Sequence, residues 1–304
     1  MTLRASARRV VEAATLGLGL AGLAERANRR AVAVLAYHNI VPDGEKPDGD
    51  LSLHLPEASF RDQLDCLQEN YRIVSLDDLE RPGERGSSPL VAITFDDAYA
   101  GAVSAGTAEL GRRALPSTVF VPAGMLGRRS FWWDRLADDD GVVEPGARDH
   151  ALWSLGGDDE GVRHWMSAEG LRERELPDHA LSATSDELRK ATASDLVTIA
   201  AHGSGHLNFA ASRGEALNRE LIGAAAALEA DFGSYRPWMA YPYGLYTGAV
   251  ESAAASTYRM AFRVDGGLLR PGDLLARPRA LPRVNVPAGL SAPGLRLRVA
   301  GLRS

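Results

Sequence analysis

The chain has 304 residues, of which 45% are hydrophobic and 24% are charged, and its formal net charge is −6. This composition is typical of a globular protein with a sizeable core, in one large domain or two small ones. The acidic balance argues against a nucleic-acid surface, which needs a basic stripe, and leaves small molecules, carbohydrates and proteins as partners. The single cysteine, Cys66, cannot form an internal disulfide, and its helical setting predicts a packed thiol.

Residues 1–30 combine basic side chains with a short apolar stretch, a pattern shared by signal peptides and amphipathic helices. Glu12 interrupts the start of this pattern, and the apolar stretch over 13–24 is too short to cross a bilayer. We therefore expect a helical extension and a cytoplasmic protein, with an exported or membrane-associated form as the alternative.

Apolar runs alternate with amphipathic stretches along most of the remaining chain. Strands are predicted over 31–40, 91–95, 117–121, 196–202, 238–244, 258–264 and 280–286. Helices are predicted over 57–71 and 214–233, the second with an apolar face and Gly233 as its C-terminal cap. This alternation indicates an α/β fold with a parallel sheet, either open or closed into a barrel. In both forms, reactive residues lie at the carboxyl ends of the strands.

Residues 134–190 break the alternation, because this segment is acidic, contains several glycines and is weakly periodic. We expect an inserted, solvent-facing subdomain or lid at about these positions. The predicted organisation is therefore a helical extension over 1–30, a main domain over 31–290 that carries the insertion, and a C-terminal tail over 291–304.

Two polar motifs follow predicted strands. Asp96 and Asp97 come directly after an apolar strand, where their mutual repulsion must be offset. His202 and His206 lie four apart in a glycine-containing loop after a later strand, a spacing that suits zinc. A divalent cation held by one aspartate and both histidines would offset the repulsion, while the other aspartate serves as a base. The alternatives are a helix N-cap for the aspartates and ordinary surface or core histidines.

The motifs "TFDDA", "HGSGH" and "YPYG", in this order, with "AYHNI" upstream and "FWWD" between them, resemble the polysaccharide deacetylase family, carbohydrate esterase family four. The resemblance covers roughly residues 31–286. It implies a distorted (β/α) barrel that removes N-acetyl groups, occasionally O-acetyl groups, from amino-sugar glycans with a divalent metal. By position, Asp96 would be the base, and the metal ligands would be Asp97, His202 and His206.

The sequence departs from the family pattern at several positions. Ala98 follows the aspartate pair in place of the usual glycine. Gly203 stands where a serine or threonine normally helps to shape the histidine loop. Ala240 aligns with the arginine that orients the base, so this arginine is missing from its usual motif. Arg236 and Arg283 are the candidates to reach in from nearby.

The late motif that normally carries the acid histidine is also absent, because no histidine follows His206. Branches resembling the bacterial poly-N-acetylglucosamine deacetylases are circularly permuted and carry this histidine on an N-terminal strand. "LAYHNI" matches that element, which makes His38 the candidate acid, with a core histidine as the alternative. His54 is expected at the start of a helix. No role is assigned to the histidines of the insertion, His150, His164 and His179.

Trp132 and Trp133 precede the insertion, and tryptophan faces suit stacking on sugar rings. Packing of the insertion onto the barrel is the alternative explanation for both. We assign Tyr241 and Arg283 as further substrate-binding residues. The resemblance makes the backbone N–H of Tyr243 an oxyanion donor.

The sequence therefore predicts a metal-dependent hydrolase, with Zn²⁺ as the expected ion, that removes N-acetyl groups from an amino-sugar glycan or glycoconjugate and releases acetate. One alternative is a deacylase of a lipid-linked or small amino sugar that uses the same residues. The other is a catalytically silent carbohydrate-binding protein on the same fold. We expect no nucleic-acid partner and no integral membrane segment.

Overall fold

The computed structural model describes residues 12, 15–80, 89–171, 173–233 and 235–302, and parallel strands form its centre. Among these residues, seven strands form a ring, because β1 pairs with both β10 and β5. The order around the ring is β1, β10, β9, β8, β7, β6 and β5. These strands are β1 (Val32–Tyr37), β5 (Leu90–Phe95), β6 (Ser117–Val121), β7 (Val197–Ala201), β8 (Trp238–Ala240), β9 (Met260–Gly266) and β10 (Leu281–Asn285). The barrel that the sequence predicted is therefore confirmed, in its closed form.

The barrel is distorted at β5. One edge of β5 pairs along its whole length with β1, from Val32 opposite Leu90 to Tyr37 opposite Phe95. The other edge is divided, because β4 (Arg72–Val74) pairs with the first half of β5 and β6 pairs with the second half. As a result β4 lies outside the ring.

Two predicted strands end earlier than the sequence indicated. The strand predicted over 31–40 is interrupted at His38, and the next residues form β2 (Asn39–Val41), which pairs with β3 (His54–Pro56) in a separate small sheet. The strand predicted over 238–244 ends at Ala240 and gives way to a 3₁₀ turn, Pro242–Gly244. Proline has no N–H for a ladder hydrogen bond, which favours this early end.

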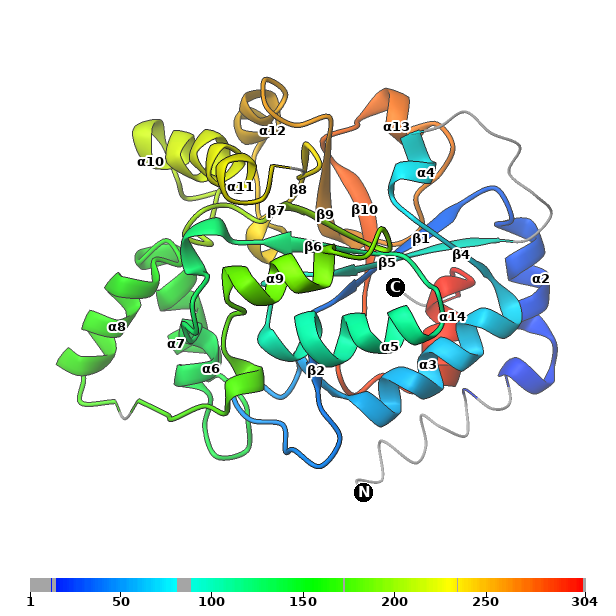
Figure 1. The fold of residues 1–304 in the computed structure, drawn as a ribbon, viewed down its shortest axis with the longest axis horizontal. Helices are drawn as coiled ribbons and strands as arrows, with labels where there is room; N and C mark the ends of the chain where they lie inside the picture. The colour runs from blue at the N-terminus through cyan, green and yellow to red at the C-terminus, as the bar shows by residue number, and fades with distance from the viewer. Residues whose placement is uncertain (1–11, 13–14, 81–88, 172, 234, 303–304) are drawn as a thin grey trace.

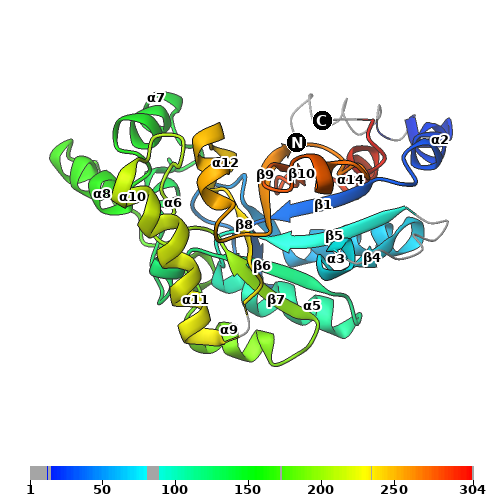
Figure 2. The same ribbon diagram turned by 90° about the horizontal axis from the view of Figure 1, so that it is seen from above.

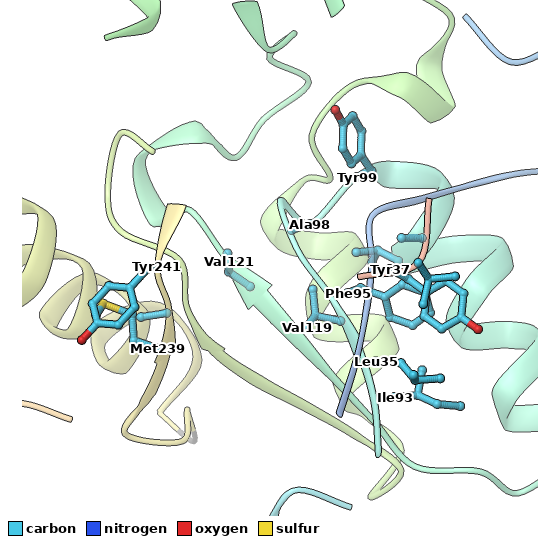
Figure 3. Close-up of a cluster of buried hydrophobic side chains, with 14 of the residues drawn as sticks. Leu35, Tyr37, Ile93, Phe95, Ala98, Tyr99, Val119, Val121, Met239 and Tyr241 are labelled. Carbon is cyan, nitrogen blue, oxygen red and sulfur yellow. The ribbon is translucent and has the colours of Figure 1, made fainter. Parts of the chain in front are cut away.

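Strand side chains pack in two apolar layers, one inside the barrel and one against the surrounding helices. All six residues of β1 and of β5 are buried, as expected for strands covered on both faces. The inner layer includes Val34, Ala92, Phe120, Phe262 and Leu281. The outer layer includes Leu35, Tyr37, Ile93 and Phe95, which gather beside β1 and β5 in Figure 3. Phe60 packs on both Tyr37 and Phe95, with ring centroids 5.2 and 5.9 Å apart.

Helices surround the ring (Figure 1). They are α2 (Leu20–Ala27), α3 (Glu57–Asn70), α4 (Asp77–Glu80), α5 (Thr107–Arg112), α9 (Ser185–Thr192), α10 (Gly214–Asn218), α11 (Ala224–Phe232), α12 (Gly248–Ala254), α13 (Asp273–Ala276) and α14 (Ala292–Val299). A π-helical turn, Arg219–Gly223, joins α10 to α11, so the helix predicted over 214–233 forms with this interruption. Gly233 caps it in the left-handed conformation, at φ 63°.

Both ends of the described chain are helical. The segment predicted as a C-terminal tail contains α14, whose Leu295 and Leu297 are buried, and α14 contacts α3 and α2 (Figure 1). Cys66 lies half-buried in α3, with its sulfur 3.8 Å from the carbonyl oxygen of Ala292. The helical extension predicted over 1–30 includes α2, whereas residues 1–11, 13 and 14 lie outside the described part. Among the described residues, no helix has the length and apolarity that a membrane span requires. The cytoplasmic location stays a prediction.

The insertion after β6 forms short helices at the carboxyl ends of the barrel strands. They are α6 (Trp132–Leu136), α7 (Pro145–Asp149), a π-helical turn (His150–Ser154) and α8 (Asp159–Ala168). In Figure 2, the arrowheads of β1 and β5 point toward the side of the molecule that carries these helices. This places the insertion beside the strand ends, where the sequence motifs predict the site.

Candidate metal and catalytic site

A cavity of about 390 Å³ lies at the carboxyl ends of the strands, and it brings most of the predicted site residues together. Asp96 and Asp97 follow β5, His202 follows β7, and His206 closes the same loop as His202. The predicted residues that line the cavity are His38, Asp96, Asp97, Trp133, His202, His206 and Tyr243. Parallel strands thus deliver motifs that are distant in the sequence to one point in space.

Asp97, His202 and His206 are spaced as metal ligands. The Oδ1 atom of Asp97 lies 3.0 Å from Nε2 of His206 and 3.3 Å from Nε2 of His202. The two Nε2 atoms are 3.2 Å apart. Ligand atoms bonded to a tetrahedral zinc at about 2.0–2.1 Å are separated by about 3.3–3.4 Å, so these three atoms fit such an ion. Among the described residues, this Asp97 oxygen is buried without a hydrogen-bond donor, as expected for an atom directed at a cation.

A backbone contact fixes the orientation of His202. Its Nδ1 atom lies 2.8 Å from the carbonyl oxygen of Ala240, at the end of β8. Because a carbonyl oxygen only accepts hydrogen bonds, Nδ1 carries a hydrogen, and in the neutral imidazole this leaves the lone pair of Nε2 for a metal. The position aligned with the missing arginine therefore still contributes to the site, through its backbone.

The backbone of the site is strained. Asp97, Ala98, His206 and Tyr243 have φ values of 66°, 51°, 59° and 58°, in the left-handed region that non-glycine residues rarely adopt. Such strain persists only where surrounding contacts enforce it, and it is concentrated at functional sites. The geometry also explains why glycine is usual after the aspartate pair, because Ala98 keeps a side chain in a conformation that favours glycine.

Arg283 binds Asp96, the aspartate that is not in the ligand set, from inside the barrel. Its two terminal nitrogens donate hydrogen bonds of 2.7 Å to the two carboxylate oxygens of Asp96. The same guanidinium donates to the hydroxyl of Thr94 and to the carbonyl of Arg263, and it lies 5.3 Å from the ring centroid of Phe120. The residue is 0% exposed, so the sequence-based assignment of Arg283 to substrate binding does not match its position.

The other candidate arginine is not at the site, because Arg236 pairs with Asp77 at 2.9 Å. Of the two arginines proposed to replace the missing one, only Arg283 contacts Asp96. A bidentate guanidinium–carboxylate pair fixes both the position and the plane of the carboxylate. Arg283 therefore orients Asp96.

The charges of the site stabilise ionised carboxylates. Burial would raise the pKa of Asp97, but the adjacent His206 and His202 outweigh it and hold this pKa well below its usual range. Burial likewise opposes ionisation of Asp96, yet Arg283 and His202 lower the pKa of this carboxyl. Burial lowers the pKa of His206, which favours the neutral imidazole that a metal requires.

His38, the predicted acid, follows β1 and lies beside Asp96 at the cavity. Tyr37 is paired with Phe95 across β1 and β5, so His38 and Asp96 leave the two strands side by side. The backbone N–H of Asp96 donates to the carbonyl of Tyr37 at 2.9 Å, which ties the two strand ends together. His38 is half-buried and lines the cavity.

Of the aromatic residues assigned to substrate binding, Trp133 alone is among the described residues that line the cavity. Trp132 is buried and donates its indole N–H to the hydroxyl of Tyr243 at 2.8 Å. Tyr241 stacks on Tyr246, with centroids 4.4 Å apart, and its hydroxyl donates to a backbone carbonyl. Trp132 and Tyr241 therefore support the site by packing.

A buried polar network stands behind Trp133. The indole N–H of Trp133 donates to the hydroxyl of Tyr99 at 2.7 Å, and Tyr99 donates to Asp134 at 2.6 Å. Nε2 of His54 lies 2.8 Å from the other oxygen of Asp134. His54 is the first residue of β3 and not the start of a helix, and it joins the first residues of the insertion to the barrel. His179, which was assigned no role, contacts the same network through Asn39 at 3.2 Å.

Several residues that line the cavity carry no signal in the sequence. Arg148, Leu152 and Trp153 come from the insertion, whose weak periodicity predicts no particular face. Further cavity residues are Leu53, Leu245, Val264 and Asn285. The insertion therefore forms part of the cavity wall.

The family model for polysaccharide deacetylases matches residues 83–261. The chain belongs to the polysaccharide deacetylase family. It is accordingly a carbohydrate deacetylase, a hydrolase of a metal-dependent family, and the resemblance of the motifs to this family is confirmed. Among curated proteins, no sequence matches this deacetylase.

Solved structures show the same fold. The deacetylase PplD of Streptococcus pyogenes, in complex with acetate, is 16% identical with a TM-score of 0.61, over 88% of this chain and 98% of that one. IcaB from Ammonifex degensii is 19% identical with a TM-score of 0.61, over 89% and 97%. A de-N-acetylase from Aggregatibacter actinomycetemcomitans is 18% identical with a TM-score of 0.57, over 84% and 94%. At these identities the likeness establishes the fold of the deacetylase.

Proposed function

We propose that this protein removes N-acetyl groups from an amino-sugar glycan or glycoconjugate, with Zn²⁺ held by Asp97, His202 and His206. The observation that carries the proposal is the ligand spacing of these three residues beside Asp96, whose carboxylate Arg283 orients. The de-N-acetylase among the similar structures supports an N-acetyl substrate.

The two imidazole nitrogens and one carboxylate oxygen form a ligand set that zinc accepts, with a position left for water or substrate. When bound, such an ion polarises a carbonyl group and lowers the pKa of water. Proton transfer and the orientation of the reacting groups are the work of the residues around the metal site.

In the proposed reaction, Asp96 accepts a proton as water attacks the carbonyl carbon of the acetamide. Arg283 keeps the carboxylate ionised and oriented for this transfer. The backbone N–H of Tyr243 donates to the oxygen that gains negative charge. The carbon–nitrogen bond then breaks as His38 gives a proton to the departing nitrogen. The products are acetate and a free amino sugar.

The arginine missing from its usual motif had favoured a catalytically silent protein. Arg283 removes that objection, because it supplies the contact to Asp96 from another strand. A second candidate substrate, a lipid-linked amino sugar, is favoured by the apolar cavity wall of Leu152, Trp153 and Leu245.

The test is acetate release from N-acetylglucosamine oligosaccharides and from a lipid-linked N-acetyl amino sugar. The protein is assayed after removal of metal with a chelator and again after one equivalent of Zn²⁺ is restored. We expect acetate only from the restored protein, and a preference for the lipid-linked substrate would support the second candidate. A metal-loaded protein that binds these sugars but releases no acetate would establish the silent alternative.

A further inference from the structure

Glu220 is a buried carboxylate that contacts the loop between the two histidines. Its Oε1 atom accepts a hydrogen bond of 2.8 Å from the backbone N–H of Gly205. Its Oε2 atom accepts from the backbone N–H groups of Ser204, at 3.0 Å, and Leu207, at 3.4 Å. The residue is only 4% exposed. One side chain therefore holds three of the loop's backbone donors.

The same carboxylate explains the glycine at position 203. Gly203 has φ 77°, and a Cβ atom added there would lie 2.6 Å from Oε2 of Glu220 and 3.2 Å from the ring of Phe209. No serine or threonine fits in that space while Glu220 occupies it. The glycine at position 203, in place of the usual hydroxyl residue, is therefore what makes room for the Glu220 carboxylate.

The helix that carries Glu220 directs it toward the barrel. Glu220 lies in the π-helical turn, and it is buried together with Leu221 and Ala224 of the apolar face. A π-helical turn leaves a backbone carbonyl without its regular helical partner. Here the hydroxyl of Tyr258 donates a hydrogen bond of 2.6 Å to the backbone carbonyl of Leu221. Such turns are frequent at functional sites.

A buried carboxylate is costly unless hydrogen bonds compensate for the lost water. Burial raises the pKa of Glu220, and the N–H groups of Gly205, Leu207 and Ser204 act against this rise. Hydrogen bonds to an ionised acceptor are stronger than neutral ones, so both the loop and the carboxylate gain from the contact.

We propose that Glu220 is a positioning residue that holds the His202–His206 loop in its metal-binding conformation, in place of the hydroxyl residue missing at position 203. The inference rests on the proposed metal site. His206 has φ 59°, a strained backbone conformation that surrounding contacts must hold. Glu220 supplies such contacts on both sides of His206, at Ser204 and at Leu207. Loss of these contacts allows the loop to relax and His206 to leave the ligand position.

The test measures metal affinity in the metal-free full-length protein. Co²⁺ is titrated in competition with a chromophoric chelator, and its visible absorption bands report the ligand geometry. The variants are Glu220→Ala and Glu220→Gln, with Glu215→Gln as the matched control, because Glu215 is exposed on the same helix. We expect about 10–100-fold weaker Co²⁺ binding and altered bands in both Glu220 variants, and no change in the control.

A rescue separates positioning from a general loss of structure. Gly203→Ser alone should weaken Co²⁺ binding, because its Cβ collides with Glu220. Combined with Glu220→Ala, the collision is removed and only the strain of a serine at φ 77° remains, so we expect the combined loss of affinity to be smaller than the sum of the two single losses. If Glu220→Ala does not fold, Glu220→Gln alone supplies the test, because it keeps the volume of the side chain.

Unchanged Co²⁺ affinity and bands in a folded Glu220 variant would overturn the inference, as would strictly additive losses in the double variant. These outcomes differ from failure of the proposed function, in which the unmodified protein itself binds no Co²⁺.

Discussion

Arg283 binds Asp96 through two parallel hydrogen bonds of 2.7 Å, although the two residues lie 187 positions apart. Arg283 comes from β10 and Asp96 follows β5, and β1 lies between these strands in the ring. The aligned position of the family arginine, Ala240, belongs to β8. The same contact to the base is therefore made from a different strand, which leads to the first prediction.

Arg283→Gln should shift the acid limb of the pH–rate profile to higher pH. Arg283 lowers the pKa of Asp96, so the base stays ionised into the acidic range. Without the guanidinium, burial raises this pKa, and the base is protonated at a pH where the unmodified enzyme is active. The measurement is kcat/KM against pH for both proteins.

Arg236→Gln is the matched control, because Arg236 pairs with Asp77 away from the cavity. Arg283→Gln leaves Asp96 buried without its partner, so we also expect this variant to lose about 3–5 kcal/mol in the free energy of unfolding. Arg283→Lys keeps the charge but loses the bidentate contact, so its acid limb should shift less than that of Arg283→Gln. An acid limb unchanged in folded Arg283→Gln would contradict the role assigned to Arg283.

His202→Ala or His206→Ala should remove bound zinc, because two remaining protein ligands hold the ion poorly. The measurement is metal content by elemental analysis after dialysis against a weak chelator. His164→Ala is the control, since His164 is exposed on the insertion. Full occupancy in both ligand variants would disprove the site.

Substitution of Asp96 and substitution of Asp97 should affect different properties, turnover in the first case and metal binding in the second. Asp96→Asn should lower turnover by about 10²–10⁴-fold and keep the metal, because the base is lost while the ligands remain. Asp97→Asn should weaken metal binding, because it removes a ligand. Metal content and acetate release are measured on the same samples. The reverse order would mean that the two roles are exchanged.

His38→Ala should distinguish amide from ester substrates. An amine leaves only when it is protonated, so loss of the acid should cost about 10²–10⁴-fold on the amide. An aryl acetate releases a stable anion and should lose much less. Rates on both substrates are compared at equal metal content. Equal losses would identify a structural histidine, and unchanged amide hydrolysis would place the acid elsewhere.

Most of the barrel could be predicted, because strands buried on both faces are continuous apolar runs in the sequence. Two such runs are followed directly by Asp96 and by His202, so the core of the site was visible as well. The apolar pattern alone left the closure of the ring open, and the family resemblance supplied it, because an apolar run shows that β1 is buried but not that its neighbours are β5 and β10. The pairing of Arg283 with Asp96 depends on that closure, which is why two arginines remained as candidates.

Glu220 was missed although the sequence contains a signal for it. Leu217 and Leu221 mark the apolar face of its helix, and Glu220, three positions after Leu217, falls on the same face. A carboxylate there needs a partner, and that partner is the histidine loop. Arg148 and Trp153 had no comparable signal, because their segment lacks a regular apolar pattern.

The position of β1 has a consequence for how the protein matures on the ribosome. Of the seven strands, β1 is made first, but it cannot complete its pairing until β10 emerges, so the ring stays open while the strands between them are made. Contacts between segments so distant in sequence form slowly, and incomplete barrels expose strand edges that aggregate. Asp96 can form its hydrogen bonds with Arg283 only once β10, which carries Arg283, has joined the ring. Until β10 emerges, the nascent chain therefore carries the sequence motifs of a deacetylase, but its Asp96 lacks the arginine that stabilises the charge of the carboxylate.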